Sequence, residues 1–461
     1  QLAYTCKKLT GKAYALSTDS DVYLYDLASG QTRNLTEGMP GYDKYPVFSP
    51  DDSMLAFTSM ERAGNESDKS RLFVETLATG EKRYLTRNFD YNAGNVRWDG
   101  NGTLYFIAPV RGTYQVCRVD LADDSVRVLT AGAHDVNAIT LNGGELVGEV
   151  TSLSAPTELF RIDPADGTMT RITNTNPEIY DHIRMGEVRE RWIRTTDGRQ
   201  MLTWVVLPPD FDSTERYPAL LYCQGGPQSV VSQFWSYRWN LQLMAAQGYV
   251  VVAPNRRGVP SFGQQWLDQI SGDYSGQNIR DYLSAIDDVA AEPWVDGGRL
   301  GCVGASYGGY SVFFLAGHHQ KRFKAFIAHC GMFNLESMYG ATEELWFPNN
   351  DLGGPYWSDD TTAQRSYANS PHKFVKNWDT PILIFSGQGD FRIPYTESLQ
   401  AFTAARLMGV PSRLVSFEDE AHQIFKPQNS LVWNREFFGW LDKYLKHTET
   451  DSAQSPDSSK R

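Results

Sequence analysis

Alternating apolar and polar residues in short runs, separated by Asp and Gly turns, fill the first 180 residues of the chain. Residues 21–36 closely resemble residues 71–86, and both stretches end on Leu-Thr. The pair recurs at Leu129-Thr130, and Ile172-Thr173 is a conservative fourth copy, so the units follow one another at intervals of roughly 43 to 50 residues. This spacing of short strands is typical of four-stranded propeller blades.

The first of these units is shorter than the second, which opens with the stretch 45–53 ahead of its strand. Four blades, one of them incomplete, cannot comfortably close a ring. We therefore expect residues 1–180 to form an incomplete all-β propeller of about four blades, with the earlier blades missing from the chain. A β-sandwich with regular hairpins is the structural alternative.

Beyond residue 188 the pattern changes to strands that alternate with helices. Two strands flank the Asp197-Gly198 turn, and apolar runs typical of buried strands then alternate with stretches of helical periodicity. The expected strands are 188–195, 201–207, 219–222, 249–253, 300–303, 326–329, 382–385 and 412–417, and the expected helices are 240–247, 278–291, 397–408 and 433–444. This alternation predicts a mostly parallel sheet with helices on both faces over residues 188–447. Residues 448–461, rich in Ser, Asp and Lys, are expected to be a disordered tail.

Composition narrows the possible partners. A chain of 461 residues is too long for one ordinary core, and 41% hydrophobic with 21% charged residues fits a soluble globular protein. No apolar run is long enough to span a bilayer. The net charge of -12 argues against nucleic acid or an anionic membrane surface as a partner.

The sequence contains no motif for a metal or a nucleotide, so we expect no cofactor. The five cysteines are widely spaced and form no metal-like pair. Cys302 and Cys330 lie in apolar runs and are expected to be buried structural thiols.

Candidate chemistry starts at residues 304–308, where Gly-Ala-Ser-Tyr-Gly matches the pattern Gly-x-Ser-x-Gly. The pattern alone is weak, but here it follows an apolar strand and precedes an apolar helix, where a nucleophile elbow must lie. Small residues flank Ser306 because the turn is sharp and the hydroxyl must project above the sheet. Ser306 is therefore the candidate nucleophile, and a strand-to-helix turn without chemistry is the alternative.

A serine nucleophile needs a base and an orienting acid, which follow in the order acid, then His, in α/β-hydrolases. Elimination among the eight histidines leaves His422, just after the expected strand 412–417. Asp390 stands at the end of the preceding strand on a Gly-rich loop and is the candidate acid. Glu418, Asp419 and Glu420 are rivals, but they lie too close in sequence to His422 to orient it well.

Two backbone N–H groups are expected to form an oxyanion hole. One is the N–H of Tyr307, which follows the nucleophile. The other should come from the loop after the first core strand, Gln224-Gly225-Gly226-Pro227, because Gly lets the backbone approach a substrate closely. A simple Gly-Pro turn is the alternative reading of this loop.

Together these features resemble the prolyl oligopeptidase family of serine peptidases, and the resemblance covers nearly the whole chain. Its motifs here are the propeller repeats with Ser-Pro-Asp at 49–51, the elbow at 304–309, Asn-Arg-Arg-Gly at 255–258, Gly-Gly-Pro at 353–355 and Asp-Phe-Arg-Ile-Pro at 390–394. Within the family the chain looks most like the bacterial dipeptidyl peptidases of type V and the acylaminoacyl peptidases. The resemblance implies an α/β-hydrolase domain preceded by a partial propeller, and an enzyme that cuts short peptides.

The resemblance also implies roles for single residues. Arg392, two residues after the acid, would bind the carbonyl of the residue that precedes the scissile one, and Gly226 would be the second oxyanion donor. Relatives have Tyr or His at the position of Gln224, so a hydroxyl donor is absent there and a backbone donor is the safer assignment.

The resemblance further implies an acyl pocket lined by Tyr307 and the segment 332–346, including Phe333, Tyr339 and Trp346. A place for these aromatics in the core is equally open. Apolar walls suggest an apolar or small residue before the cut. Glu149 and Glu158 are candidate anchors for a free substrate amine.

The leading functional hypothesis is a serine exopeptidase that releases dipeptides from the N-terminus of short peptides through an acyl-enzyme. The alternatives are an acylaminoacyl peptidase or oligopeptidase, a lipase or carboxylesterase, and a propeller scaffold with an inactive hydrolase domain. A homodimer is compatible with the resemblance, which also points to the periplasm or to secretion.

Overall fold

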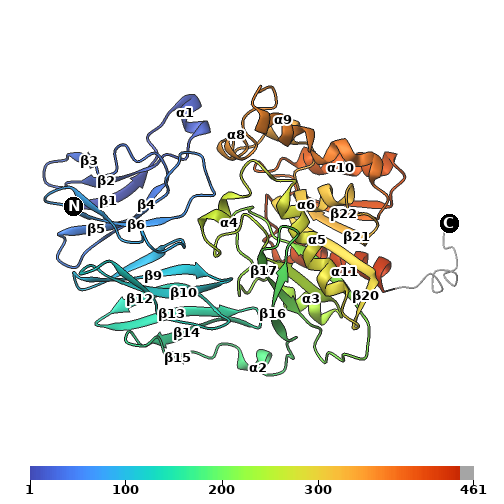
Figure 1. Ribbon diagram of the computed structural model, residues 1–461, viewed down its shortest axis with the longest axis horizontal. Coiled ribbons are helices and arrows are strands. Elements are labelled where there is room, and N and C mark those ends of the chain that lie inside the picture. Colours follow the sequence, from blue (N-terminus) through green and yellow to red (C-terminus); the bar gives the residue numbers. More distant parts are fainter. Residues whose placement is uncertain (447–461) are drawn as a thin grey trace.

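The computed structural model describes residues 1–446, so the tail expected at 448–461 lies outside the described residues. Four small antiparallel sheets form the N-terminal part, and one eight-stranded sheet with helices forms the rest (Figure 1). The fold class expected from the sequence, an α/β-hydrolase domain preceded by a propeller-like all-β part, is therefore confirmed.

The N-terminal sheets follow one another along the chain. The first sheet has three strands, β1 (Leu2–Cys6), β2 (Asp21–Tyr25) and β3 (Thr32–Asn34). The other three sheets have four strands each: β4 (Asp43–Phe48), β5 (Met54–Ser59), β6 (Arg71–Thr76) and β7 (Glu81–Tyr84); β8 (Gly94–Asp99), β9 (Thr103–Val110), β10 (Thr113–Asp120) and β11 (Ser125–Val128); and β12 (Asp135–Asn142), β13 (Glu145–Ser152), β14 (Ala155–Ile162) and β15 (Met169–Arg171). Two short helices, α1 (Gly11–Leu16) and α2 (Pro177–Tyr180), accompany them.

The first strand of each sheet contacts the first strand of the next, β1 with β4, β4 with β8 and β8 with β12. Sheets placed side by side through their first strands are the arrangement of propeller blades. Buried apolar side chains from neighbouring sheets share common cores, such as Leu85 with Phe106. The number of blades in an intact propeller stays a prediction.

The recurring Leu-Thr pair has a structural role. In each sheet the threonine Oγ1 accepts a hydrogen bond from a backbone N–H of the third strand, or of the second strand in the three-stranded sheet. The pairs are Val22 with Thr36, Leu72 with Thr86, Val116 with Thr130 and Leu159 with Thr173, at 2.9 to 3.0 Å. The repeat seen in the sequence is thus a repeated closing bond at the end of the outermost strand.

The large sheet has the order β16-β17-β19-β18-β20-β21-β22-β23. Its strands are β16 (Val188–Arg194), β17 (Gln200–Val206), β18 (Tyr217–Cys223), β19 (Val250–Pro254), β20 (Val295–Ala305), β21 (Phe323–His329), β22 (Ile382–Gly387) and β23 (Ser412–Phe417). The hairpin β16–β17 is antiparallel, as the Asp197-Gly198 turn predicts, and β17 also pairs antiparallel with β19. From β19 to β23 every pair is parallel.

Helices cover both faces of this sheet. The helices of the hydrolase part are α3 (Leu241–Ala246), α4 (Gln264–Asp268), α5 (Gln277–Ala290), α6 (Tyr307–Ala316), α7 (Leu335–Tyr339), α8 (Trp346–Asp351), α9 (Thr361–Ala368), the 3-10 helix η1 (Pro371–Asn377), α10 (Tyr395–Leu407) and α11 (Pro427–Leu445). Apolar side chains of α5, α6 and α10 pack in one core, and those of α3 and α11 pack in the core of the other face. In Figure 1, α4 and α8 lie on the side of the hydrolase part that faces the N-terminal sheets.

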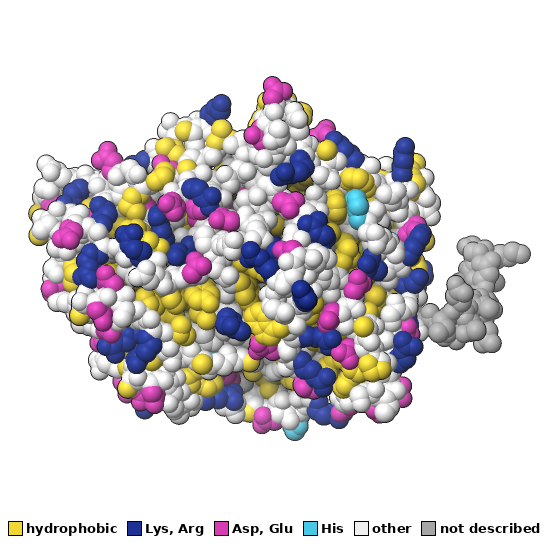
Figure 2. All heavy atoms as spheres, viewed as in Figure 1, with side chains coloured by type: hydrophobic (Ala, Val, Ile, Leu, Met, Phe, Trp, Pro, Cys, Tyr) yellow, Lys and Arg dark blue, Asp and Glu magenta, His cyan; other side chains and the backbone are white. Residues whose placement is uncertain are grey.

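Among residues 1–446, no helix has both the length and the apolar character that crossing a membrane requires. On the face of the molecule in Figure 2, Lys and Arg side chains are interspersed with Asp and Glu. The acidic excess is therefore not gathered into a single patch on this face.

Candidate active site

Ser306 lies between the end of β20 and the start of α6, with φ 60 and ψ -123. A positive φ is rare for a residue with a side chain and marks a strained turn held by its surroundings. The two neighbouring glycines explain why the turn can form. A Cβ on Gly304 would approach the carbonyl oxygen of Gly308 to 2.6 Å, and one on Gly308 would approach that of Cys223 to 2.0 Å.

A continuous chain of hydrogen bonds joins Ser306 to a buried carboxylate. His422 Nε2 lies 3.0 Å from Ser306 Oγ, and His422 Nδ1 lies 2.7 Å from Asp390 Oδ2. Asp390 is 3% exposed, and its other oxygen accepts hydrogen bonds from the backbone N–H groups of Arg392 and Ile393 at 3.0 Å. The structure thus brings the three expected residues together, although they are far apart in sequence.

Two further glycines let the loop that carries Asp390 approach the loop that carries His422. A Cβ on Gly387 would lie 2.1 Å from the carbonyl oxygen of Ala421, and one on Gly389 would lie 3.2 Å from that of Glu420. The Gly-rich sequence after β22 therefore serves a close backbone contact.

The surroundings of His422 favour its protonated form. Burial alone would lower its pKa, but the electrostatic interaction with Cys330 and the hydrogen bond to Asp390 outweigh burial and raise the pKa above the usual value. An imidazolium formed during a reaction would be stabilised by the same groups.

The rival acids are engaged elsewhere in their own loop. Asp419 pairs with Lys426 at 2.6 Å. Glu420 accepts hydrogen bonds from the backbone N–H groups of Phe425 and Lys426, at the start of α11. Neither carboxylate bonds to the imidazole of His422, whose bonded acid is Asp390.

The loop 224–227 lies beside the elbow, as the sequence suggests. A Cβ on Gly225 would lie 3.5 Å from Ser306 Cβ, and Gly226 has φ +115, a conformation that favours glycine. Tyr307 is the first residue of α6, whose first N–H groups have no acceptor within the helix. Both expected oxyanion donors are thus close to Ser306 in the fold.

Two of the aromatic residues expected to line the pocket, Phe333 and Tyr339, lie in the core instead, whereas Tyr307 lines the cavity although its ring is buried. The Tyr307 side chain is fully buried in the core, where its hydroxyl donates to Asn278 Oδ1 at 2.6 Å. Phe333 packs against Phe313 and Trp378 in the same core. Tyr339 is also buried there, with its hydroxyl 3.2 Å from Asn349 Oδ1.

Phe333 contacts Phe313 of α6, and Phe333 and Tyr339 both belong to the core that α6 shares with α5 and α10. Only Trp346 of the three later aromatics lines the cavity beside Ser306.

The cavity beside Ser306 has a volume of about 440 Å³ and is built by both parts of the molecule. Its hydrolase side includes Gly226, Trp346 and Arg392, all expected from the sequence. The remaining lining residues are Tyr42, Met60, Glu66, Asp68, Ser70 and Asn92 from the N-terminal sheets, and Pro227, Gln228, Tyr307, Met332, Glu344, Phe347 and Ile393 from the hydrolase part.

Three carboxylates of this cavity were not expected from the sequence; Asp68 is bonded to Arg62 and Asn65, and the other two are Glu66 and Glu344. Glu66 accepts hydrogen bonds from the Tyr42 hydroxyl at 3.1 Å and the Trp346 indole N–H at 3.2 Å. Glu344 pairs with Arg392 at 2.8 Å. Burial raises the pKa of both groups above the usual value. A cationic group of a ligand would offset the cost of burying these two carboxylates in their charged form.

Glu66 is delivered by the loop of residues 60–70, which joins β5 to β6 and lies against the hydrolase part. Arg62 of this loop pairs with Asp268 of α4 at 2.7 Å. The Ser67 hydroxyl lies 2.8 Å from the Ser271 hydroxyl. The backbone carbonyl of Ser67 accepts a hydrogen bond from Gln264 Nε2 at 2.6 Å. No sequence motif marks this loop, because its function depends on contacts between distant parts of the chain.

A buried carboxylate, Asp351, ties this loop to the oxyanion loop. It is 1% exposed and accepts hydrogen bonds from Tyr274 at 2.7 Å, Ser271 at 2.8 Å and Gln228 at 3.0 Å. Gln228 also donates to Ser67 Oγ at 3.1 Å. Gln228 follows Gly226-Pro227 directly, so the contact between the two parts also holds the oxyanion loop.

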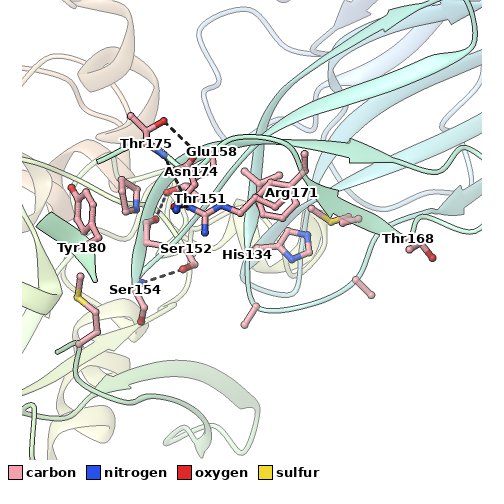
Figure 3. A pocket seen from close by; sticks show the side chains of 18 of the residues that line it. His134, Thr151, Ser152, Ser154, Glu158, Thr168, Arg171, Asn174, Thr175 and Tyr180 are labelled. Carbon is pink, nitrogen blue, oxygen red and sulfur yellow. Dashed lines mark hydrogen bonds and ion pairs between the residues drawn. The ribbon is translucent and has the colours of Figure 1, made fainter. Parts of the chain in front are cut away.

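A larger cavity, of about 640 Å³, lies over the last N-terminal sheet and away from Ser306 (Figure 3). Glu158 lines it and is engaged by Arg171 at 2.9 Å, by the backbone N–H of Thr175 at 2.7 Å and by the Thr173 hydroxyl. Neither Glu158 nor Glu149 lines the cavity beside Ser306, so their expected role as amine anchors there is not supported by their positions.

All five cysteines are free thiols, and Cys302 and Cys330 are buried as expected. Cys330 differs from the other buried thiols because its Sγ lies 4.0 Å from His422 Nε2. Burial alone would raise the pKa of Cys330, but the imidazoles of His329 and His422 outweigh burial and lower it. Sequence reasoning missed this contact because Cys330 lies in an apolar run.

Comparison with known proteins agrees with this geometry. The sequence model of the prolyl oligopeptidase family matches residues 235–448. Two similar curated proteins are both named dipeptidyl-peptidase 5. The one from Porphyromonas gingivalis is 54% identical over 448 residues, which are 96% of this chain and 65% of that protein. The one from Porphyromonas endodontalis is 51% identical over 449 residues, again 96% and 65% of the two chains.

The chain thus spans 65% of the length of these two curated relatives. Among solved structures, an acylaminoacyl peptidase from Pyrococcus horikoshii has a TM-score of 0.84 at 21% identity and covers 97% of this chain and 69% of that chain. An acylaminoacyl peptidase in complex with Z-Gly-Gly-Phe-chloromethyl ketone has a TM-score of 0.83 at 22% identity, with 94% and 67% covered. At these identities the likeness concerns the fold.

Proposed function

Because its hydrolase part, matched over residues 235–448, belongs to the prolyl oligopeptidase family, we propose that the chain is a serine exopeptidase. It releases dipeptides from the free N-terminus of short peptides through an acyl-enzyme. The observation that carries this proposal is the hydrogen-bonded series Ser306–His422–Asp390 at the wall of a cavity that also contains the carboxylates of Glu66 and Glu344.

In the first half of the reaction, Ser306 Oγ attacks the carbonyl carbon of the scissile bond. His422 Nε2 accepts the hydroxyl proton, and Asp390 keeps the Nδ1 proton in place and stabilises the imidazolium. When the tetrahedral intermediate collapses, His422 gives the proton to the leaving amine. A water then attacks the acyl-enzyme with the same base, which releases the dipeptide and regenerates Ser306.

The N–H groups of Tyr307 and Gly226 would stabilise the negative charge that develops on the substrate oxygen. Arg392 would bind the carbonyl of the first substrate residue. Glu344 occupies part of its guanidinium, which has five N–H donors in a fixed fork and so retains donors for a substrate.

The carboxylates support a substrate with a free amine. Glu66 and Glu344 approach the cavity from the N-terminal sheets and from the hydrolase part, respectively. Since burial disfavours their charged forms, a substrate ammonium would gain a charge-assisted hydrogen bond and stabilise the carboxylates in turn.

The apolar part of the lining supports an apolar or small residue before the cut. Met332, Trp346 and Phe347 contribute to this wall. A charged side chain placed against them would lose its hydration without a partner.

An acylaminoacyl peptidase is the second candidate, favoured by the close likeness of the fold to such enzymes. An N-acylated substrate carries no ammonium, so Glu66 and Glu344 would then have no role in binding it. An inactive scaffold is opposed by the complete hydrogen-bond series at Ser306.

The deciding experiment compares a fluorogenic dipeptidyl amide that has a free amine with its N-acetylated twin, using Ser306→Ala as the blank. A preference of at least tenfold for the free amine supports a dipeptidyl peptidase. Equal or better cleavage of the acetylated form makes acylaminoacyl peptidase the correct reading. If neither is cut and a fluorophosphonate does not label Ser306, the peptidase proposal is wrong.

Short peptides are the partners that this proposal requires. A homodimer and a periplasmic or secreted location stay predictions from the resemblance to the family.

A further inference from the structure

Cys330 occupies an unusual position directly beside the candidate base. It follows β21, has φ 39, and is 2% exposed. Its Sγ lies 4.0 Å from His422 Nε2 and 3.5 Å from the His422 carbonyl oxygen. The proposed reaction does not use this thiol, although it stands next to the nitrogen that accepts the Ser306 proton.

The thiol, the imidazole and the carboxylate form a set of metal-ligand types. One ligand atom each from Cys330, His422 and Asp390 lie within 4.8 Å of one another. Sulfur together with imidazole nitrogen is the ligand combination of zinc and other thiophilic cations, whereas magnesium and calcium prefer oxygen.

The hydrogen bond from His422 to Asp390 is of the kind that usually orients a metal-binding histidine. Such a histidine donates its second ring N–H to a carboxylate, which fixes the ring and makes the ligating nitrogen more basic. Here Nδ1 is bonded to Asp390 at 2.7 Å, and Nε2 lies 3.0 Å from Ser306 Oγ. The arrangement that suits a general base therefore also suits a metal ligand.

The distances permit a bridging ion after a small adjustment. With zinc–sulfur and zinc–nitrogen bonds of about 2.3 and 2.0 Å at a tetrahedral angle, the sulfur and nitrogen would be roughly 3.6 Å apart. The observed separation is 4.0 Å. Closing the difference requires only a slight rotation of the Cys330 or His422 side chain, and Ser306 Oγ or water can complete the coordination.

His329, which precedes Cys330, is a less suitable ligand. The Trp433 indole N–H can only donate, so His329 Nδ1 must accept the 3.2 Å hydrogen bond between them. The proton of the neutral ring then lies on Nε2, which is buried. Both nitrogens of neutral His329 are thus unavailable, and the donor pair is Cys330 with His422.

We propose that a thiophilic divalent cation such as Zn²⁺ binds Cys330 Sγ and His422 Nε2 and reversibly inhibits the enzyme. The ion binds the Nε2 lone pair that would accept the Ser306 proton, and the one proton held by the Cys330 Sγ and His422 Nε2 pair is released to solvent when the two metal bonds form. Nothing is oxidised, so a chelator should restore the free site. The inhibitory consequence rests on the proposed function, whereas binding does not.

Binding is tested without any substrate. Cd²⁺ is titrated into the reduced protein while the near-ultraviolet absorption of cadmium–thiolate charge transfer is followed, and Zn²⁺ is used as competitor. We expect one saturable site that is lost in Cys330→Ala. The matched control is Cys302→Ala, because Cys302 Sγ lies 3.7 Å from Cys223 Sγ and these two thiols are the rival pair. Retention of the signal in Cys330→Ala, or its loss in Cys302→Ala, overturns the site.

Inhibition is measured against the metal-free rate of each variant. We expect Zn²⁺ to inhibit the wild type, EDTA to reverse the effect, and Mg²⁺ and Ca²⁺ to have none. Cys330→Ala should need at least about tenfold more Zn²⁺, since even the loss of an outer partner of a metal ligand costs that much affinity. Equal Zn²⁺ sensitivity in the wild type and Cys330→Ala would overturn the inhibitory role.

Failure of the two proposals can be told apart. If the charge-transfer signal depends on Cys330 but no peptide is cut, the metal site stands and the proposed peptidase function is wrong. If peptides are cut but no cation binds at Cys330, the peptidase function stands and the metal site is wrong. Near-ultraviolet circular dichroism of each variant verifies that the fold is retained.

Discussion

In the eight-stranded sheet, Ser306, Asp390 and His422 each follow the carboxyl end of a parallel strand, whereas the N-terminal sheets reach the same cavity mainly through the loop 60–70. The reacting groups are thus placed by the topology of one sheet, where the ends of parallel strands meet at one edge. The positions of the groups proposed to select the substrate depend instead on the contact between the N-terminal sheets and the hydrolase part.

This difference predicts that the two parts tolerate change unequally. An altered reacting group should abolish chemistry for every substrate. An altered group on the loop should change which substrates are accepted, because the chemistry is assembled without it. The following predictions, from the largest expected effect to the smallest, test this division.

Ser306→Ala should lower kcat by roughly 10⁶-fold, because Ser306 is the lining residue whose hydroxyl is hydrogen-bonded to the candidate base His422. Loss of fluorophosphonate labelling, followed by mass spectrometry, gives an independent readout. Ser311→Ala in the same helix is the control, since its hydroxyl bonds only to the Tyr307 carbonyl at 3.0 Å and should leave labelling intact. Substantial residual activity in Ser306→Ala would identify a different nucleophile.

Asp390→Asn should lower kcat by about 10⁴-fold, because an amide cannot hold the same histidine tautomer or stabilise the imidazolium. The loss should be equal for free-amine and acetylated substrates. Glu420→Gln is the comparison, since Glu420 bonds to backbone N–H groups near α11. A larger loss in Glu420→Gln than in Asp390→Asn would reverse the assignment of the acid.

Glu66→Gln should lower kcat/KM for the free-amine substrate by roughly 10- to 100-fold, the range expected for one hydrogen bond to a charged group. The acetylated twin should be cleaved as before, because it brings no ammonium. Glu61→Gln is a matched control on the same loop, as the Glu61 side chain is 72% exposed. Equal losses with both substrates would mean that Glu66 supports the loop and does not select the amine.

The same division explains how much could be predicted from the sequence. The strands and the longer helices of the hydrolase part were predicted because each depends on local periodicity, and Ser306 because its glycine neighbours are required by the turn itself. Asp390 and His422 could be placed because the order of strands along the chain constrains their positions. The expected elements differ from the observed ones mainly at their ends, as for the last helix, expected at 433–444 and observed as α11 (Pro427–Leu445). The short helices α4, α7, α8, α9 and η1 were not expected, because they are too short to show a helical period.

The lining of the cavity could not be predicted in the same way. Phe333 and Tyr339 carry the side chains of a binding pocket, but the direction in which each points depends on the fold of an irregular segment. Glu66 lies about 240 residues before Ser306 in a loop without a motif, so only the contact between the two parts reveals it. Cys330 reads as an ordinary buried thiol until His422 is placed beside it.

The smallest expected effects concern stability, and each part offers one test. Burial raises the pKa of Glu397 in the hydrolase part to about 7, and likewise that of Asp43 in the N-terminal sheets to about 7. An acid whose pKa is raised by folding stabilises the fold fully below its unfolded pKa, and this contribution is lost as the pH rises through the folded value. Between about pH 4 and pH 7, each group should therefore cost stability, on the order of 3 to 4 kcal/mol.

Glu397 accepts hydrogen bonds from the backbone N–H groups of Phe333 and Asn334 at 3.1 and 2.6 Å, and a glutamine oxygen can still accept them. Glu397→Gln should thus flatten the pH dependence of urea unfolding for the hydrolase part, and Asp43→Asn that for the N-terminal sheets. If the parts unfold separately, each variant moves only its own transition. One common transition that both variants shift would instead mean that the contacts of the loop 60–70 couple the two parts into one cooperative unit, and the division drawn from the active site would not extend to stability.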